Sequence, residues 1–203
     1  RSEFNNDTHY DGQWGIFDEP FLVNMVSEIS NYQTPFLTTV FTLSSHNPYK
    51  IPSKYHHKFP KGNLENLEAL GYADYSLRQF FNEAKKKDWF NNTLFVLSAD
   101  HTAISNDAFY NNAVGQYAIP ILFYTAATER ARIDATGNLG LGVVPSAWTS
   151  SAKALQIGTK GVIYNAFNAT YFGNNFYVNS TPSPVYLENG YAQLYSQESD
   201  GLH

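Results

Sequence analysis

The chain has 203 residues, of which 43% are hydrophobic, and a formal net charge of −5 at pH 7. This length and apolar content are enough for one domain with a sizeable core, and the acidic balance gives no basic footprint, so we expect no nucleic-acid partner. We find no cysteine, no apolar run of the ~20 residues that a membrane span needs and no signal peptide; the first of these excludes disulfides, thiolate metal sites and a cysteine nucleophile among these residues.

A helix is predicted from Asp18 to about Asn31. Asp18 can serve as its N-cap, and Pro20 stands early in it, where the missing N–H costs nothing. One face of this helix is marked by apolar residues at Phe21, Met25 and Ile29. Trp14, which precedes the helix, is interpreted as a core or staple residue rather than a ligand contact, because aromatic side chains mostly pack.

Residues 35–43 have strong β-propensity and are predicted to form a strand. His46 lies on the loop that leaves this strand. A single histidine in a loop is usually only solvated, so His46 alone does not indicate a site. His56 and His57 are interpreted as surface residues, because adjacent side chains point in different directions and rarely bind one ion together.

Apolar residues recur at helical spacing between residues 64 and 87, which predicts one amphipathic helix carrying Leu70, Ala73, Leu77, Phe80, Phe81 and Ala84 on its apolar face. The lysines at 85–87 fall in its last turn, where cations complement the helix dipole, and a structural role is expected for them. The apolar run 94–97 shows no alternation, which is typical of a strand buried on both faces of a parallel sheet. Strand 35–43, the helix and strand 94–97 would then form a right-handed βαβ unit.

Asp100 and His101 follow the run 94–97 where the strand would end. In open α/β sheets ligands bind at the carboxyl ends of strands, and a carboxylate next to an imidazole can hold a divalent cation through one oxygen and one nitrogen. The alternative is that Asp100 caps the next turn and His101 is a surface loop residue. A second strand-end histidine, His46, favours a site, because parallel neighbouring strands bring such ends together.

A third strand is predicted over residues 117–124. Its internal Pro120 indicates an edge position or the start of the strand. Residues 128–142 carry no clear period and are expected to form a mobile connection.

Residues 145–157 are predicted to be helical, with Gly158 placed to end the helix. From residue 162 the chain is rich in Tyr, Phe and Asn with short alternations. Two or three short antiparallel strands are predicted there, among them 175–178 and 191–195.

Several motifs stand in a fixed order along the chain: Trp-Gly-Ile-Phe-Asp-Glu at 14–19, Pro-Phe-Leu-Thr-Thr at 35–39, Ser-Ser-His-Asn-Pro-Tyr at 44–49, Tyr-Ala-Asp-Tyr-Ser-Leu at 72–77, Ala-Asp-His-Thr at 99–102 and Tyr-Ala-Ile-Pro-Ile-Leu at 117–122. This ordered set resembles the second half of a sulfatase-family catalytic domain. Within that family it is most similar to the lipoteichoic acid synthase and phosphoglycerol transferase branch of the alkaline phosphatase superfamily. The resemblance is dense from about residue 14 to 125 and thinner after it.

The resemblance implies an α/β fold with an alkaline-phosphatase-like mixed, largely parallel sheet flanked by helices and a small antiparallel C-terminal part. It implies that residues 1–203 are the C-terminal portion of one sulfatase-like catalytic domain, with its core at 14–125 and a less regular part at 126–203. The domain would therefore be incomplete.

The same resemblance implies that Asp100 and His101 are two ligands of the catalytic divalent metal, which is typically manganese in this branch and magnesium or calcium in relatives. His46 matches the family's substrate-side histidine, which contacts the phosphate or sulfate group. A bound dication can polarise the ester while an imidazole donor shares that load. His101 would bind as neutral imidazole, so metal affinity should weaken at acid pH.

The family's nucleophile lies on the first half of its domain, and no matching motif precedes Trp14. We therefore expect this chain to be inactive alone, and its full-length parent to be an extracytoplasmic enzyme, anchored in a membrane by segments outside these residues. The expected substrate is a phosphate or sulfate ester, which can be lipid-linked; phosphoglycerol transfer and sulfate-ester hydrolysis are not separated by these residues. A second hypothesis is a noncatalytic binding or interaction module that kept the fold and lost the chemistry.

Overall fold

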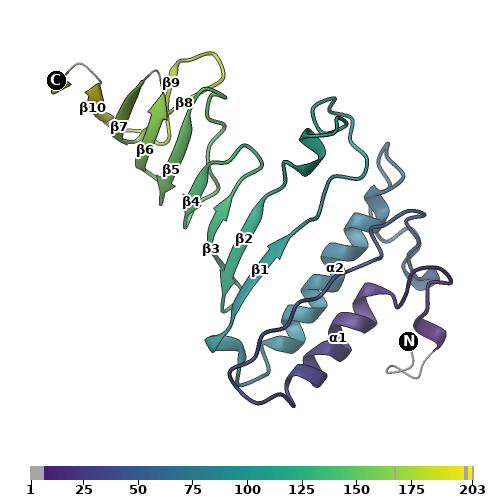
Figure 1. Cartoon of the computed structure of the whole chain (residues 1–203). Helices are drawn as coiled ribbons and strands as arrows, with labels where there is room; N and C mark the ends of the chain where they lie inside the picture. Colours follow the sequence, from purple (N-terminus) through teal and green to yellow (C-terminus); the bar gives the residue numbers. More distant parts are fainter. Residues whose placement is uncertain (1–6, 167, 199–200, 203) are drawn as a thin grey trace. The chain divides into compact units, whose positions relative to one another are not determined.

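The structure, a computed structural model, describes residues 7–166, 168–198 and 201–202. The chain divides into two compact units, one formed by residues 1–93 with 103–108 and the other by residues 94–102 with 109–203. Figure 1 traces the helices of the first unit and the sheet of the second. The single sulfatase-like domain expected over 1–203 stays a prediction.

The helices are α1 (Asp18–Ile29) and α2 (Leu67–Ala84), with short 3-10 helices η1 (Asp7–His9), η2 (Ser53–Tyr55), η3 (Phe90–Asn92) and η4 (Gly115–Tyr117). The strands are β1 (Leu94–Ser98), β2 (Ile121–Thr125), β3 (Thr128–Ile133), β4 (Leu139–Leu141), β5 (Lys153–Ile157), β6 (Gly161–Ala166), β7 (Ala169–Asn174), β8 (Phe176–Val178), β9 (Pro184–Tyr186), β10 (Gln193–Glu198) and β11 (Gly201–Leu202).

The first unit is built on α1 and α2, which pack side by side (Figure 1). Both helices form because apolar residues recur at helical spacing, and these residues face each other in the interior. Its buried apolar residues include Leu22, Val26 and Ile29 of α1 and Ala69, Tyr72, Phe80 and Ala84 of α2. Both predicted helices are confirmed: α1 begins at the predicted residue and ends two residues early, and both ends of α2 lie three residues inside the predicted ones.

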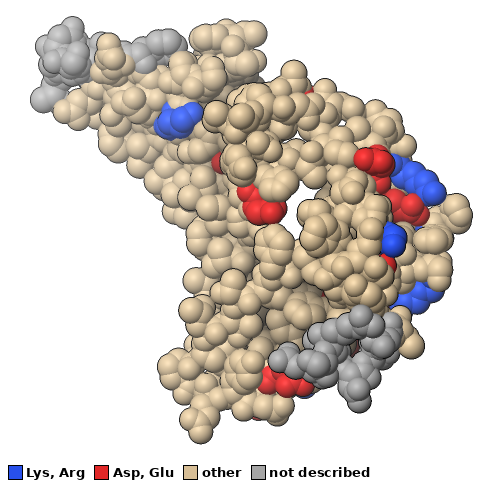
Figure 2. All heavy atoms as spheres, turned by 45° about the vertical axis from the view of Figure 1, so that its right-hand side comes forward, with Lys and Arg blue, Asp and Glu red and all other residues tan. Residues whose placement is uncertain are grey.

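The lysine run at 85–87 follows α2 and does not lie in its last turn, contrary to prediction; Lys85 N–H continues the helical hydrogen bonding to Phe81 O at 3.0 Å. Lys86 pairs with Glu83 at 2.6 Å, and Arg78 pairs with Asp74 one turn earlier at 3.0 Å. On the face drawn in Figure 2, blue and red side chains are interspersed among the described residues. These charges therefore act as local pairs on a solvated helix.

The strand predicted over residues 35–43 does not form. Residues 36–43 are extended but belong to no strand, and Leu37 and Phe41 are 92% and 65% exposed. High β-propensity describes how well side chains suit a pleated, half-buried surface, and nothing in the described part of the chain provides that surface here. Without this strand, the predicted βαβ unit is absent from the described residues.

The second unit is a nine-stranded sheet in the order β1-β2-β3-β4-β5-β6-β7-β10-β11, with a separate β8-β9 pair. This confirms an α/β chain with a mixed sheet. The predicted largely parallel pairing is wrong for the described strands, because β4–β5 is the one parallel pair and the others are antiparallel. Short connections explain the difference: Ala126 and Ala127, at φ of 48° and 54°, form a two-residue turn between β2 and β3, which only antiparallel strands allow.

β1 forms at the predicted place but is not buried on both faces. Its exposure alternates, and Leu94 and Val96 are 61% and 54% exposed. Its neighbour is the antiparallel β2, which begins directly after Pro120, so the predicted strand start at this proline is confirmed. β1 lies at one edge of the described sheet.

Two predictions beyond residue 125 are wrong. The expected mobile connection at 128–142 contains β3 and β4, whose charged and small residues hide the strand period. The helix expected at 145–157 is replaced by an irregular segment and β5. The backbone of the irregular segment forms hydrogen bonds with other parts of the chain instead of helical ones. Ser146 N–H donates to Gln156 Oε1 at 3.0 Å and Thr149 N–H to Val178 O at 2.7 Å.

The C-terminal strands bury the core of the second unit on one face of the sheet. This core contains Trp148, Ala152, Ala154, Val162, Tyr164, Ala166 and Phe176. Tyr164 stacks on Tyr171 with ring centroids 4.7 Å apart, which adds a directional aromatic contact to the burial. The short antiparallel strands predicted here are confirmed, and they are more numerous than predicted.

Candidate active site

Asp100 and His101 lie on the loop that leaves β1, where the sequence predicts them. Oδ1 of Asp100 accepts a hydrogen bond from His101 N–H at 2.9 Å, and the next residue anchors the loop through Thr102 N–H to Gln116 O at 2.7 Å. Nδ1 of His101 lies 3.1 Å from Thr102 O. Because a carbonyl oxygen can only accept, this contact places a hydrogen on Nδ1 and leaves Nε2 of the neutral ring with its lone pair.

The two side chains present one oxygen and one nitrogen to the same point. Oδ2 of Asp100 lies 3.7 Å from Nε2 of His101, and the two side chains are 56% and 40% exposed. Carboxylate oxygen and imidazole nitrogen bind divalent metals at about 2.0–2.2 Å, so these atoms are close enough to share one ion. The pair thus fits two ligands of a divalent metal. Among the described residues, no group of three or more His, Asp or Glu side chains could hold a metal.

The loop is held from one side by the 3-10 helix η4. The ring of Tyr117 lies against His101, with centroids 6.1 Å apart and the planes at 70°. Gly115 begins η4 in a very tight turn, because a Cβ at this position would lie 1.9 Å from Phe109 O. Only glycine fits there, and the orientation of the His101 loop depends on that turn.

His46 lies in the first unit, exposed on the loop that follows the extended segment 36–43. Its N–H donates to Leu43 O at 3.0 Å, and its own carbonyl accepts from Tyr49 N–H at 2.8 Å. Nδ1 lies 2.9 Å from Asn47 O, so Nδ1 carries the hydrogen here too. Nε2 is therefore the ring atom that His46 offers to a ligand.

Trp14 is a neighbour of His46 rather than a core residue, contrary to prediction. It is 55% exposed, and its ring meets the imidazole edge-on with centroids 4.5 Å apart. Nε1 of Trp14 donates to Asn47 O at 2.8 Å. Oδ1 of Asp11 fixes the backbone of this tryptophan by accepting its N–H at 2.9 Å.

Asp18 does not act as the predicted N-cap of its own helix. It is the first residue of α1 and only 1% exposed, and its Oδ1 accepts from Leu43 N–H at 2.9 Å and Ser44 N–H at 3.0 Å. In return, Asp18 N–H donates to Ser44 Oγ at 3.1 Å. An acidic residue in a first helical turn normally indicates only dipole compensation, so the sequence carries no signal for this contact with a segment 25 residues away.

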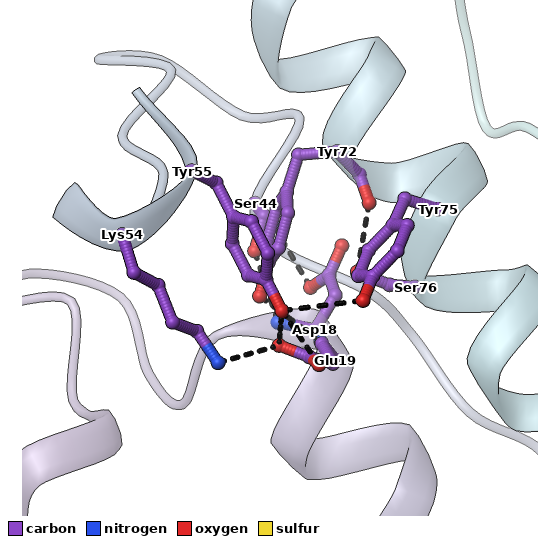
Figure 3. A network of polar contacts seen from close by, with 8 residues as sticks. All are labelled: Asp18, Glu19, Ser44, Lys54, Tyr55, Tyr72, Tyr75 and Ser76. Atoms are coloured by element: carbon purple, nitrogen blue, oxygen red, sulfur yellow. Dashed lines mark hydrogen bonds and ion pairs between the residues drawn. The ribbon is translucent and has the colours of Figure 1, made fainter. Parts of the chain in front are cut away.

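A polar network supports the start of α1 behind this contact (Figure 3). Tyr55 OH donates to the Glu19 carboxylate at 2.8 Å, and Lys54 pairs with the same carboxylate at 3.2 Å. Tyr72 OH accepts from Glu19 N–H at 3.2 Å. Burial raises the pKa of both tyrosines, in Tyr55 with added hydrogen bonds to Tyr75 and Glu19. Both hydroxyls therefore stay neutral and serve as hydrogen-bonding supports.

The structure thus brings Asp100 and His101 together in the second unit and builds a separate setting for His46 in the first. His56 and His57 are exposed, with ring centroids 6.5 Å apart, as expected for surface residues. Asp18 and Trp14 are the two residues near a candidate site that the sequence reasoning missed.

The family model described as Sulfatase matches residues 1–140, which include all three candidate site residues. The chain belongs to the sulfatase family. Lipoteichoic acid synthase 2 of Bacillus subtilis (strain 168) is 28% identical over 109 residues, or 51% of this chain and 16% of that protein. Phosphoglycerol transferase I of Escherichia coli (strain 55989 / EAEC) is 26% identical over 109 residues, or 50% of this chain and 14% of that protein.

The sulfatase-family chain thus matches only a small share of the length of these two relatives. It is also similar to a crystal structure of a protein in the alkaline phosphatase superfamily from Vibrio parahaemolyticus, with a TM-score of 0.47 and 23% identity, covering 88% of this chain and 51% of the other. In the part of the chain that the structure describes, no helix is both long and apolar enough to cross a membrane.

Proposed function

We propose that this chain contributes to a metal-dependent active site that transfers or hydrolyses a phosphate or sulfate ester outside the cytoplasm. Asp100 and His101 supply two ligands of a divalent ion, preferentially Mn²⁺, with Mg²⁺ or Ca²⁺ as alternatives, and His46 contacts the substrate. The observation that carries this proposal is the 3.7 Å separation of Asp100 Oδ2 and His101 Nε2, with Nδ1 of the imidazole tied to a backbone carbonyl. Membership of the sulfatase family and the similarity to a phosphoglycerol transferase support it.

Each residue has a role that its geometry supports. A divalent ion bound by Asp100 and His101 would supply Lewis-acid stabilisation of charge on the nonbridging oxygens of the ester. Because Nδ1 of His46 holds its hydrogen toward Asn47, Nε2 donates to an anionic ester oxygen when the ring is protonated and accepts from a substrate hydroxyl when it is neutral. A positioned donor of this kind stabilises developing charge in the transition state.

Two ligands are too few for a tight site, since structural and catalytic metal sites use at least three protein ligands or further oxygen donors. We therefore propose that the remaining ligands and the nucleophile come from polypeptide outside these 203 residues. The 203-residue chain alone should bind Mn²⁺ weakly and turn over neither ester. The intact enzyme would act on a phosphate or sulfate ester, which can be lipid-linked, and any membrane anchor would lie outside the described helices.

The test uses the intact enzyme with Mn²⁺ and two chromogenic substrates, an aryl phosphate and an aryl sulfate. Asp100→Ala and His101→Ala should each abolish turnover of whichever ester the wild type uses, at unchanged secondary structure. Asp74→Ala, which removes an exposed carboxylate from α2, is the matched control and should retain full turnover. Wild-type turnover that survives Asp100→Ala would remove the proposal, and a folded protein that turns over neither ester would favour a noncatalytic binding module.

A further inference from the structure

The carboxylate of Asp18 is buried, which costs desolvation free energy, and α1 does not need this burial in order to form. The residue is 1% exposed, and no side-chain hydrogen bond caps the helix at its N-terminus. A charge removed from water is tolerated only where hydrogen bonds replace the lost solvation. Here the replacement comes from the N–H groups of Leu43 and Ser44, which both donate to one oxygen, Oδ1.

Those two N–H groups belong to the segment that carries His46. The carbonyl of Leu43 accepts the N–H of His46 at 3.0 Å, so Asp18 and His46 hold the same residue from its two ends. The preceding residues 36–43 are paired with no strand in the described structure. The anchoring that a sheet would normally give to a residue at the end of a strand is therefore supplied at this point by Asp18.

The imidazole ring of His46 has a support of its own, which is Trp14. The carbonyl of Asn47 accepts from both Nε1 of Trp14 at 2.8 Å and Nδ1 of His46 at 2.9 Å. The indole also lies edge-on against the imidazole at 4.5 Å. Asp18 thus fixes the backbone before His46, whereas Trp14 packs against its ring and shares the Asn47 carbonyl that sets its tautomer.

We propose that Asp18 and Trp14 are positioning residues for His46, which together aim its Nε2 at the ester group. This inference rests on the proposed substrate contact of His46. Misplacing a catalytic group by about 1 Å can lower turnover about 100-fold, so loss of either support acts on kcat through the imidazole. Neither residue needs to touch the substrate or the metal.

The test is a pair of double-mutant cycles in the intact enzyme, with kcat and KM measured on the active ester and Mn²⁺ content measured separately. Asp18→Ala and Trp14→Ala should each lower kcat about 10- to 100-fold at normal Mn²⁺ content. In a His46→Ala background the same changes should lower kcat less than about threefold, because residues that act as one unit are not additive. Asp18→Asn, whose amide oxygen can still accept both N–H groups, should restore most of the activity, and Glu28→Ala on the exposed face of α1 is the control.

The outcomes separate this inference from the proposed function. Effects that multiply with His46→Ala, or an Asp18→Asn enzyme as impaired as Asp18→Ala, would overturn the positioning role while His46 keeps its own. A wild-type enzyme without activity, or a His46→Ala variant with unchanged kcat, would instead count against the proposed function. If Asp18→Ala does not fold, the Trp14→Ala cycle decides, since this side chain is 55% exposed and its removal leaves the core intact.

Discussion

Trp14 and His46 donate to a single acceptor, the carbonyl oxygen of Asn47, at 2.8 and 2.9 Å. A carbonyl oxygen has two lone pairs and accommodates both donors. The shared acceptor fixes which imidazole nitrogen is free, so the site chemistry of His46 is defined before any ligand arrives. Nδ1 of His101 likewise lies 3.1 Å from the carbonyl oxygen of the next residue, Thr102, so in both histidines Nε2 is the atom left for function.

His46→Ala should lower turnover of the intact enzyme about 100-fold or more while leaving its Mn²⁺ content normal, because the imidazole contacts the substrate rather than the ion. Steady-state kinetics and metal analysis on the same preparation measure both. His56→Ala removes an exposed imidazole ten residues away and should change neither quantity. If His46→Ala lost its Mn²⁺, the role of substrate contact given to this residue would be wrong.

Gly115→Ala should destabilise the second unit by about 2 kcal/mol or more, because the new Cβ would lie 1.9 Å from Phe109 O and the backbone would have to move. Since η4 carries the neighbour of His101, Mn²⁺ affinity should fall as well. Gly142→Ala is the matched control: its φ is +67° and nothing lies within 4 Å of the added Cβ, so only about 1 kcal/mol of backbone strain is expected. If urea unfolding showed the same loss of unfolding free energy for both variants, the steric account would be contradicted.

Glu129 and Arg132 of β3 form two hydrogen bonds of 2.6 Å, with both side chains 23% exposed. The hydrogen bonds from Arg132 outweigh burial and lower the pKa of Glu129 from its usual 4.5. A lowered carboxylate pKa contributes stability that is complete above the unfolded value and is lost as the pH falls through the folded value. The pair should therefore stabilise the protein by about 1 kcal/mol at pH 7.

Glu129→Gln should lower the free energy of unfolding at pH 7 by this amount, measured by urea unfolding. The difference in unfolding free energy between variant and wild type should shrink as the pH falls below about 4.5. Glu83→Gln breaks the exposed pair with Lys86, at 41% and 63% exposure, and serves as the control with little expected change. A Glu129→Gln difference that is the same at pH 3 and pH 7 would rule out the carboxylate as its source.

The sequence predicts best where a local pattern decides the structure. The spacing of Phe80 and Ala84 with their neighbours defines α2, and the apolar run before Asp100 places β1 correctly. Propensity and spacing mislead where distant partners decide. Residues 36–43 suit a strand but pair with no strand among the described residues, and residues 145–152 match a helical period but bond to Gln156 and Val178 instead.

The candidate site divides in the same way. His101 and His46 could be selected from motifs and residue chemistry, because an imidazole on the loop after an apolar, β-prone run is a recognisable ligand type. The contact of Asp18 with Leu43 and Ser44 could not, since it joins a helix start to a segment far along the chain. Such long-range supports become visible only when the fold is known.

Acid should weaken metal binding, because protons compete with the ion for Nε2 of His101 and for the Asp100 carboxylate. Mn²⁺ titrations of the intact enzyme at a series of pH values, followed by the electron paramagnetic resonance of free Mn²⁺, measure this directly. Affinity that does not change between neutral and mildly acid pH would argue against an imidazole ligand.

The most direct test of the central claim is the Mn²⁺ affinity of Asp100→Ala and His101→Ala in the intact enzyme, measured by the same titration beside the Asp74→Ala control. Each site variant should lose at least about 10- to 100-fold in affinity at an unchanged circular dichroism spectrum, because each removes one ligand from the ion. Asp74→Ala should bind as the wild type does. Wild-type Mn²⁺ affinity in both site variants would contradict the assignment of Asp100 and His101 as metal ligands.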